Sequence, residues 1–488
     1  MQFVYGQWAP DAGETAPGAV MVADGVSPLV EGYGPAPGLV AAASAASLPS
    51  APRGVISMFQ RNGTNVVFAF TDTSCYQLNA SFGWDLVQAG FALTADDDWS
   101  LAQYGNYLLA TNTTQGMMRY DIELGGAFVA IPEAGAPRDI FVCANYVVAC
   151  DCEDDAGNRD NRLIRTSVLG NPNDFTGAGS DYQQVEDGGR LVGGIDLKNN
   201  AALIFQDNAL RLMQFGGNAT GAFSLLKISD GRGSVGRRSI AGLDGIAYWL
   251  STDGFNSYTG NGIQHIGSGR IDDWFNGQVA VADMPRVRAA MDPLSKAVMW
   301  LYPALSNPSA TVYQNAIRYS WEFDKWSTRQ GAITYLTQIA TPGITLDAMG
   351  TDYGVLDDID ILLDSRFFQG GQPVFAALDE NYKYATFTGS SIEGEIRTAT
   401  SNSGETGLIS WITPINDCAT STLALGVKDR LDETITWKPA MPKVNGGRVP
   451  LRGRGMNVAF TEYFLAGAQW TFARGLDHLR AQTNGGPK

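Results

Sequence analysis

Histidine and cysteine are scarce in this chain of 488 residues, which has two histidines and five cysteines. The odd number and scattered positions of the cysteines argue against a disulfide framework and fit assembly in a reducing cytoplasm. Cys143, Cys150 and Cys152 are close in sequence, but no histidine lies near them and a zinc site needs four ligands. We therefore expect buried thiols, with no metal and no cofactor.

Long hydrophobic runs and helical patterns are also missing. No apolar run reaches the ~20 residues that a membrane helix needs. The first ten residues lack the basic and apolar regions of a signal peptide, so we expect neither feature. Residues 283–291 could form one short helix before Asp292 and Pro293, and no other segment shows a convincing 3.6-residue period.

What the chain does have is glycine and apolar side chains. Glycine occupies 57 positions, hydrophobic residues make up 44% and charged residues only 17%. An average globular protein is about 25% charged. With many Phe, Tyr and Trp residues, this composition favours an all-β protein with a large core and frequent glycine turns.

Short apolar runs that end in Asp, Asn or another turn residue recur along the middle of the chain. Runs of four to six apolar residues between turns are typical of fully buried strands. Successive copies lie about 40–55 residues apart, a period that indicates the four-stranded blades of a β-propeller. We predict six to eight blades, with a large β-sandwich or barrel as the alternative. The runs are at 66–72, 107–112, 146–151, 202–207, 247–253 and 298–302.

Composition changes twice along the chain and suggests three parts. Residues 1–52 are rich in Pro and Gly, which favours an extended arm that borrows its structure from a neighbour. Residues 53–390 hold the repeats and are assigned to the propeller. Residues 391–488 alternate more cleanly between apolar and polar positions, as half-exposed antiparallel strands do. We assign them to a small sandwich-like β domain.

The motifs that could carry catalysis are weak. A GxGxxG string at 231–236 is not followed by a helix, so we interpret it as a loop between strands. The sequence STDG at 251–254 is similar to turns of glycan-cleaving propellers, but only one copy occurs. Asp357, Asp358, Asp360 and Asp364 lack calcium-loop spacing. We therefore predict no catalytic, cofactor-binding or metal-binding residues and a protein that is not an enzyme.

Charge is distributed unevenly. The chain carries a net charge of −16, yet residues 438–488 hold eight basic and two acidic residues, a net of +6, which leaves −22 for the rest. Arginine side chains suit carboxylates and phosphates alike. Three roles stay open for the five arginines of this last part of the chain: a solvated surface, contact with an acidic protein or a neighbouring copy, and contact with DNA phosphate. The set is Arg448, Arg452, Arg454, Arg474 and Arg480, with 452–455 expected in a glycine-rich loop before a strand.

Several stretches, in this order, give the chain a resemblance to a known family. They are WAPD at 8–11 with EGYGPAPG at 31–38, WSLAQYGNYLLATN at 99–112, DGFNSYTG at 253–260 with IDDWF at 271–275, AALDENYKYATFTG at 376–389, RGRG at 452–455 and QWTFARGLD at 469–477. The chain resembles the tail hub or nozzle proteins of short-tailed bacteriophages, a group that includes packaged-DNA-stabilisation proteins.

The resemblance implies a structural virion protein with a propeller body. It implies a ring of several copies, expected to be six, below the portal and adaptor, which lines or closes the DNA channel and anchors tail fibres, spikes or a plug. Double-stranded DNA would pass through the ring without specific binding, because an acidic wall avoids the counterion release that drives DNA binding. The alternatives are a carbohydrate- or receptor-binding propeller module and a glycan-cleaving propeller enzyme.

Overall fold

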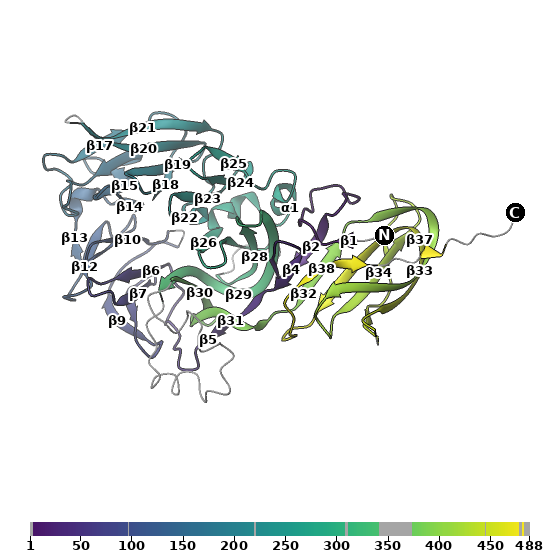
Figure 1. Cartoon of the computed structure of the whole chain (residues 1–488). Helices are drawn as coiled ribbons and strands as arrows, with labels where there is room; N and C mark the ends of the chain where they lie inside the picture. Colours follow the sequence, from purple (N-terminus) through teal and green to yellow (C-terminus); the bar gives the residue numbers. More distant parts are fainter. Residues whose placement is uncertain are drawn as a thin grey trace.

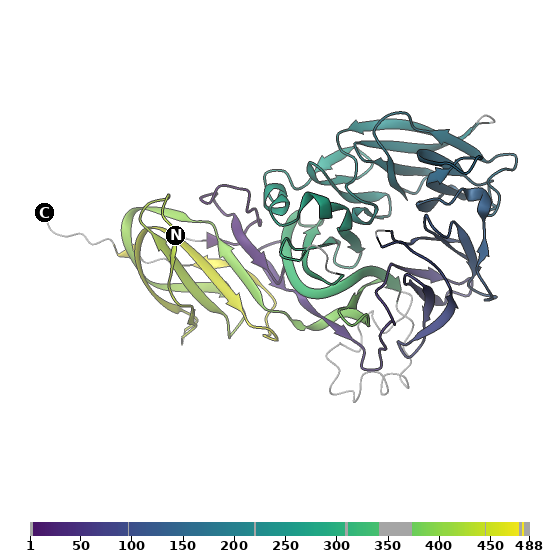
Figure 2. The ribbon, with the colours of Figure 1, turned by 180° about the vertical axis from the view of Figure 1, so that it is seen from behind.

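The structure is a computed structural model that describes residues 3–95, 97–218, 221–307, 311–340, 373–444, 446–477 and 481–482. Figure 1 shows an elongated molecule with a β-propeller at one end and a β-sandwich at the other. Seen from behind in Figure 2, the purple N-terminal arm runs between the two bodies. The predicted all-β fold is confirmed.

Five four-stranded antiparallel sheets follow one another along the chain and form blades one to five. Blade one contains β6 (Gly54–Phe59), β7 (Asn65–Phe70), β8 (Ser74–Leu78) and β9 (Trp84–Ala89). Blades two and three contain β10 (Ser100–Tyr104), β11 (Tyr107–Thr111), β12 (Met118–Asp121), β13 (Val129–Ala130), β14 (Asp139–Cys143), β15 (Tyr146–Glu153), β16 (Arg159–Thr166) and β17 (Asp181–Gln184). Blades four and five contain β18 (Leu191–Asp196), β19 (Ala201–Gln206), β20 (Ala209–Asn218), β21 (Gly221–Asp230), β22 (Ala241–Leu243), β23 (Ile246–Ser251), β24 (Gly254–Tyr258) and β25 (Ile263–His265).

One long strand belongs to the last two blades. β29 (Lys325–Ala340) pairs through its first half with β28 (Tyr313–Ser320), completing blade six with β26 (Arg288–Asp292) and β27 (Ala297–Tyr302). Its second half pairs with β30 (Pro373–Asp379) and begins blade seven. β29 also lies against β6 and closes the ring. Within the described residues the propeller therefore has seven blades, inside the predicted range.

The outer strand of blade seven comes from the other end of the chain. β31 (Tyr384–Ser391) pairs with β30 on one side and with β5 (Pro37–Ala41) on the other. An N-terminal strand that completes the last blade ties the two ends of the propeller sequence together. The arm thus docks on its own chain.

The recurring apolar runs form the second strand of a blade in each case. β7, β11, β15, β19, β23 and β27 are buried along nearly their whole length. A strand that packs against neighbouring blades on both faces needs continuous apolar residues rather than alternation. These runs were therefore correctly predicted as fully buried strands.

The sandwich is built from the last part of the chain together with the arm. Its long strand β33 (Ser401–Asn416) pairs first with β37 (Val449–Phe464) and then with β38 (Ala473–Asp477). The arm adds β1 to β38 and β2 to β32. The remaining strands are β1 (Phe3–Val4), β2 (Val20–Asp24), β3 (Val26–Pro28), β4 (Tyr33–Pro35), β32 (Gly394–Thr398), β34 (Thr422–Lys428), β35 (Thr436–Trp437), β36 (Met441–Pro442) and β39 (Ala481–Gln482).

The helix predicted at 283–291 is wrong. The chain forms the 3₁₀ helix η3 (Val281–Arg286) there and then enters β26, whose residues pair with β27. Pro285 cannot continue an α-helical hydrogen-bond ladder, and the blade needs an inner strand from Arg288 onward. The other helical segments among the described residues are η1 (Pro132–Ala134), η2 (Arg237–Ser239) and α1 (Asp272–Asn276).

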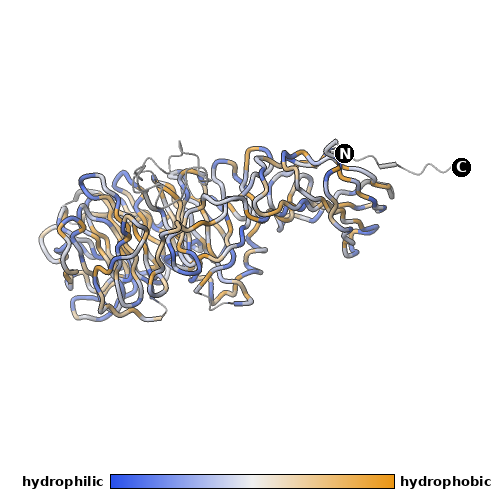
Figure 3. Tube along the Cα trace, turned by 90° about the horizontal axis from the view of Figure 1, so that it is seen from below, coloured by the Kyte–Doolittle hydropathy of each residue, from blue (hydrophilic) through white to orange (hydrophobic). Residues whose placement is uncertain are grey.

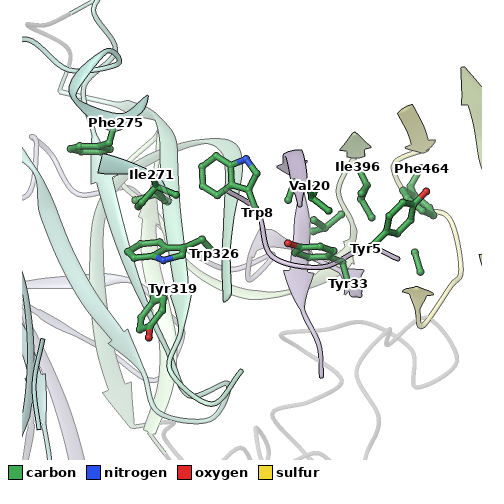
Figure 4. Packing of buried hydrophobic residues seen from close by; sticks show 14 of the residues in the cluster. Tyr5, Trp8, Val20, Tyr33, Ile271, Phe275, Tyr319, Trp326, Ile396 and Phe464 are labelled. Carbon is green, nitrogen blue, oxygen red and sulfur yellow. The ribbon is translucent and has the colours of Figure 1, made fainter. Parts of the chain in front are cut away.

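A single apolar cluster joins the propeller to the sandwich. Tyr5, Trp8 and Tyr33 of the arm are buried in it, between Trp326 of blade six and Phe464 of β37 (Figure 4). The rings of Trp8 and Trp274 meet edge to face at 4.9 Å between centroids. Figure 3 shows hydrophobic and hydrophilic segments interspersed along the traces of both bodies. The arm thus acts as core for both bodies, which fixes one relative to the other.

Candidate functional site

The arginines predicted in a glycine-rich loop lie instead in a strand. Arg452 and Arg454 are exposed within β37, whereas Gly453 between them and Gly455 after them are buried. A Cβ at Gly453 would come 2.5 Å from the Cδ2 atom of Leu425. Glycine is therefore required by close packing against β34, so the loop prediction is wrong. The alternation places both guanidinium groups on the outer face.

Three of the five predicted arginines gather on this face and are called the arginine row: Arg448, Arg452 and Arg454. Arg448 is exposed one residue before β37 begins. Trp411 of β33 pairs with Pro450, and its side chain is 45% exposed. Within the part of the chain that the structure describes, none of the three guanidinium groups forms an ion pair. The row is therefore a basic surface with an exposed aromatic side chain beside it.

The other two predicted arginines are not part of the row. Arg474 lies in β38 and forms an ion pair with Glu31 of the arm, with 3.5 Å between Nε and Oε2. Its guanidinium also stacks on Phe472 at 4.7 Å. Arg480 lies outside the described residues. Arg474 therefore helps to hold the arm on the sandwich.

Other residues singled out in the sequence occupy structural positions. The GxGxxG string connects β21 to η2, so it is the predicted loop between blades. Cys143, Cys150 and Cys152 are buried, and burial raises the pKa of each thiol. The four aspartates at 357–364 lie outside the described residues. Among the described residues, no group of three or more His, Cys, Asp and Glu side chains could hold a metal ion. No helix in the described part of the chain could cross a membrane.

The structure also assembles arginines at the propeller axis, which the sequence did not single out. A cavity of about 320 Å³ lies between inner strands of blades one, five, six and seven and is called the axial cavity. Arg237, Arg238 and Arg288 line it beside Tyr335. Among the described residues that line this cavity, none is acidic. The axis of an acidic protein is thus locally basic.

Three guanidinium groups surround one carboxylate at the end of this cavity. Asp98 lies 3.2 Å from Nη2 of Arg288, 3.5 Å from Nε of Arg238 and 3.8 Å from Nη1 of Arg53. All four side chains are at most 27% exposed. Arg53, Arg238, Arg288 and Asp98 are called the axial cluster. Its formal charge is +2.

Polar and aromatic neighbours hold these arginines in place. Arg238 donates through Nη1 to the hydroxyl of Tyr335 at 2.7 Å and through Nη2 to the carbonyl oxygens of Arg53 and Trp99. Arg288 donates through Nε to the hydroxyl of Tyr313 at 3.1 Å. Burial lowers the pKa of Arg288, but Asp98 and the tyrosines outweigh it and raise the pKa above its usual value. Arg288 therefore stays charged.

Arg237 is neutralised separately. Its Nε donates to Asp139, which also accepts hydrogen bonds from Oγ of Ser100 at 2.6 Å and from the Gly194 amide at 2.9 Å. This buried carboxylate links blades two, three and four to η2. The pair therefore braces the propeller and leaves the excess charge of the axial cluster unchanged.

No family model matches the chain, and no curated protein matches it. Among solved structures, it is similar to U3-55K, with 9% identity, a TM-score of 0.39 and coverage of 61% of this chain and 89% of that one. It is similar to virginiamycin B lyase from Staphylococcus aureus, with 12% identity, a TM-score of 0.37 and coverage of 60% and 87%. It is also similar to YCF48 bound to D1 peptide, with 12% identity, a TM-score of 0.37 and coverage of 64% and 92%.

Proposed function

We propose that this chain is a structural, non-enzymatic protein of a bacteriophage tail. Six copies would form a hub or nozzle ring below the portal and adaptor proteins, assembled in the host cytoplasm and retained in the virion. The ring would line or close the DNA channel and anchor fibre, spike or plug proteins. The resemblance along the sequence motivates this proposal.

The observation that supports ring formation most directly is the arginine row. Arg448, Arg452 and Arg454 are exposed, and they belong to a sandwich that lies at the opposite end of the molecule from the propeller (Figure 1). Complementary charges on two protein surfaces speed encounter and fix orientation. We infer that the row docks on an acidic surface of a neighbouring copy or of a tail partner. The alternative of a DNA phosphate contact is less compatible with the −22 carried by residues 1–437.

The connection between the two bodies fits a ring subunit. A docking surface on the sandwich can set the position of the propeller in an assembly only when the sandwich is held rigidly against the propeller. The apolar cluster around Tyr5, Trp8 and Tyr33 supplies this stiffness. DNA would then pass between copies, through the lumen of the ring, where an acidic wall limits sticking.

The first test counts copies of this chain, against the portal protein, in virus particles purified from the source lysate. Quantitative mass spectrometry should find one copy per two portal subunits, as expected for a six-fold ring below a twelve-fold portal. Absence of the chain from purified particles would refute the tail assignment. Glycan-binding and hydrolysis assays would then test the two alternative functions.

The second test reverses charge in the row. The double variant Arg452→Glu with Arg454→Glu should fold normally, because both side chains are exposed, but should not be incorporated into tails. The matched control is Arg430→Glu with Lys438→Glu, an equal charge change at exposed positions of the same domain. Normal incorporation of the first variant would refute docking through the row, without bearing on the particle count.

A further inference from the structure

The axial cluster carries an inference that does not depend on the proposed function. We propose that the axial cavity of the propeller binds a small molecule with two or more phosphate or carboxylate groups, held by Arg53, Arg238 and Arg288. The binding site is the cavity of about 320 Å³ that Arg238 and Arg288 line. Arg53 approaches from the wider opening that it shares with Asp98.

The first argument is charge. Asp98 offsets only one of three guanidinium groups, and no other described carboxylate lies within ion-pair distance of them. Arginine does not lose its proton in proteins, so this excess cannot be relieved by titration. A buried charge without a partner is strongly unfavourable. An anion in the cavity would supply the missing countercharge.

The second argument is an unsatisfied donor. The Nη1 atom of Arg288 is buried and has no hydrogen-bond partner among the described residues. The Arg288 side chain is 14% exposed and lines both the axial cavity and the wider opening next to it. Leaving a charged donor unpaired in such a place costs more than leaving a neutral one. Because this atom is not itself open to the cavity, the guanidinium group must rotate before an oxyanion there can accept the hydrogen bond.

The third argument is that the guanidinium groups are already positioned. Arg288 lies 5.1 Å from the ring centre of Tyr335 and Arg238 lies 5.8 Å from it. These contacts, with the hydrogen bonds to Tyr335 and Tyr313, leave each group few conformations to lose on binding. Preorganised groups bind a ligand with a smaller entropy cost.

Size and lining restrict the ligand further. A volume of about 320 Å³ lies at the lower end of small-molecule sites, which span ~300–1,000 Å³. Ser57, Thr337 and Gln338 add neutral polar side chains to the wall. Such a cavity suits a compact anion such as pyrophosphate or citrate and is too small for a nucleic acid duplex.

The test uses the full chain and calorimetric titration with sodium pyrophosphate and, separately, trisodium citrate, at matched ionic strength. At least one of the two anions should bind saturably, with one site per chain. Tighter binding of pyrophosphate would indicate a phosphate ligand, and tighter binding of citrate would indicate a carboxylate ligand. Equal binding would also support the site. Failure of both to bind at 10 mM (on the order of the weakest affinity of interest) would overturn the proposal.

Variants separate binding from structural effects. Arg288→Gln should weaken binding at least tenfold, on the order of one charge-assisted hydrogen bond. Arg286→Gln, at the wider opening and paired with Asp283 at 3.8 Å, is the matched control and should change affinity less than about twofold. Asp98→Asn should tighten binding severalfold, even if it lowers the melting temperature of the free protein. Weaker binding by Asp98→Asn would overturn the charge argument.

Discussion

The buried carboxyl of Glu462 should make the stability of this protein depend on pH in an unusual direction. Glu462 lies in β37 and is fully buried. The hydroxyl of Tyr5 donates to its Oε2 at 2.8 Å, and Nδ2 of Asn416 donates to its Oε1. Burial raises the pKa of Glu462 to about 7, although these donors and Lys443 lower it. This carboxyl joins the arm to the sandwich.

The sign of the pH dependence follows from which state, folded or unfolded, keeps the proton of Glu462. Between pH 4.5, the usual pKa of a glutamate side chain, and pH 7, the folded chain keeps a proton that the unfolded chain releases. The folded state then binds more protons, so its stability falls as pH rises through this window and levels off above it. A difference of about 2.5 pKa units corresponds to about 3 kcal/mol.

The perturbation is Glu462→Gln, which keeps the shape of the protonated acid and removes its titration. The free energy of unfolding of the variant, minus that of the natural chain, should increase by about 3 kcal/mol between pH 4.5 and pH 8. Effects of other titrating groups cancel in this difference.

Urea unfolding followed by tryptophan fluorescence at pH 4.5, 6 and 8 measures this difference. Glu380→Gln, in the exposed turn after β30, is the control and should show no such trend. A difference for Glu462→Gln that stays constant with pH would refute the reasoning. It would mean that the hydrogen bonds from Tyr5 and Asn416 stabilise the charged form enough to cancel the effect of burial.

Two other perturbations test the packing. Gly453→Leu should destabilise the sandwich by about 1–3 kcal/mol because the new side chain would overlap Leu425. The control Arg452→Leu, on the outer face, should cost much less. If both variants lowered the urea midpoint equally, the inward packing of Gly453 would be contradicted. A chain that starts at residue 42 lacks all the strands of the arm, β5 included, so amide exchange should accelerate in β31 of blade seven and in β32 of the sandwich, which pairs with β2, and not in β15 of blade three. Unchanged exchange in β31 would show that β5 does not hold the last blade.

The propeller could be predicted because its signal is local. Each blade contains one strand buried on both faces, and such a strand must be apolar along its length, as in β15 and β27. Most of these strands end at Asp or Asn, so the repeat is visible without any knowledge of pairing. The seven-bladed count could not be obtained in this way.

The count depends on pairings between distant segments. β29 serves two blades, and the last blade is completed by β5, more than 340 residues before β31. Nothing in the local pattern of residues 37–41 specifies that partner, because one face of a short strand fits many neighbours. The composition of the arm indicated docking, and only the fold gives its place.

The two groups of arginines show the same limit. Arg452 and Arg454 could be found because they are neighbours in sequence, yet their environment was wrongly predicted: a Gly-Arg alternation fits a strand with a tightly packed inner face as well as a loop. Arg53, Arg238 and Arg288 begin or precede the inner strands of different blades, where each looks like an ordinary surface charge. When the blades close into a ring, their inner strands converge on the axis, and this brings the three arginines close to one another. In a propeller, charged residues that recur just before inner strands are therefore candidates for an axial site, whatever their separation in sequence.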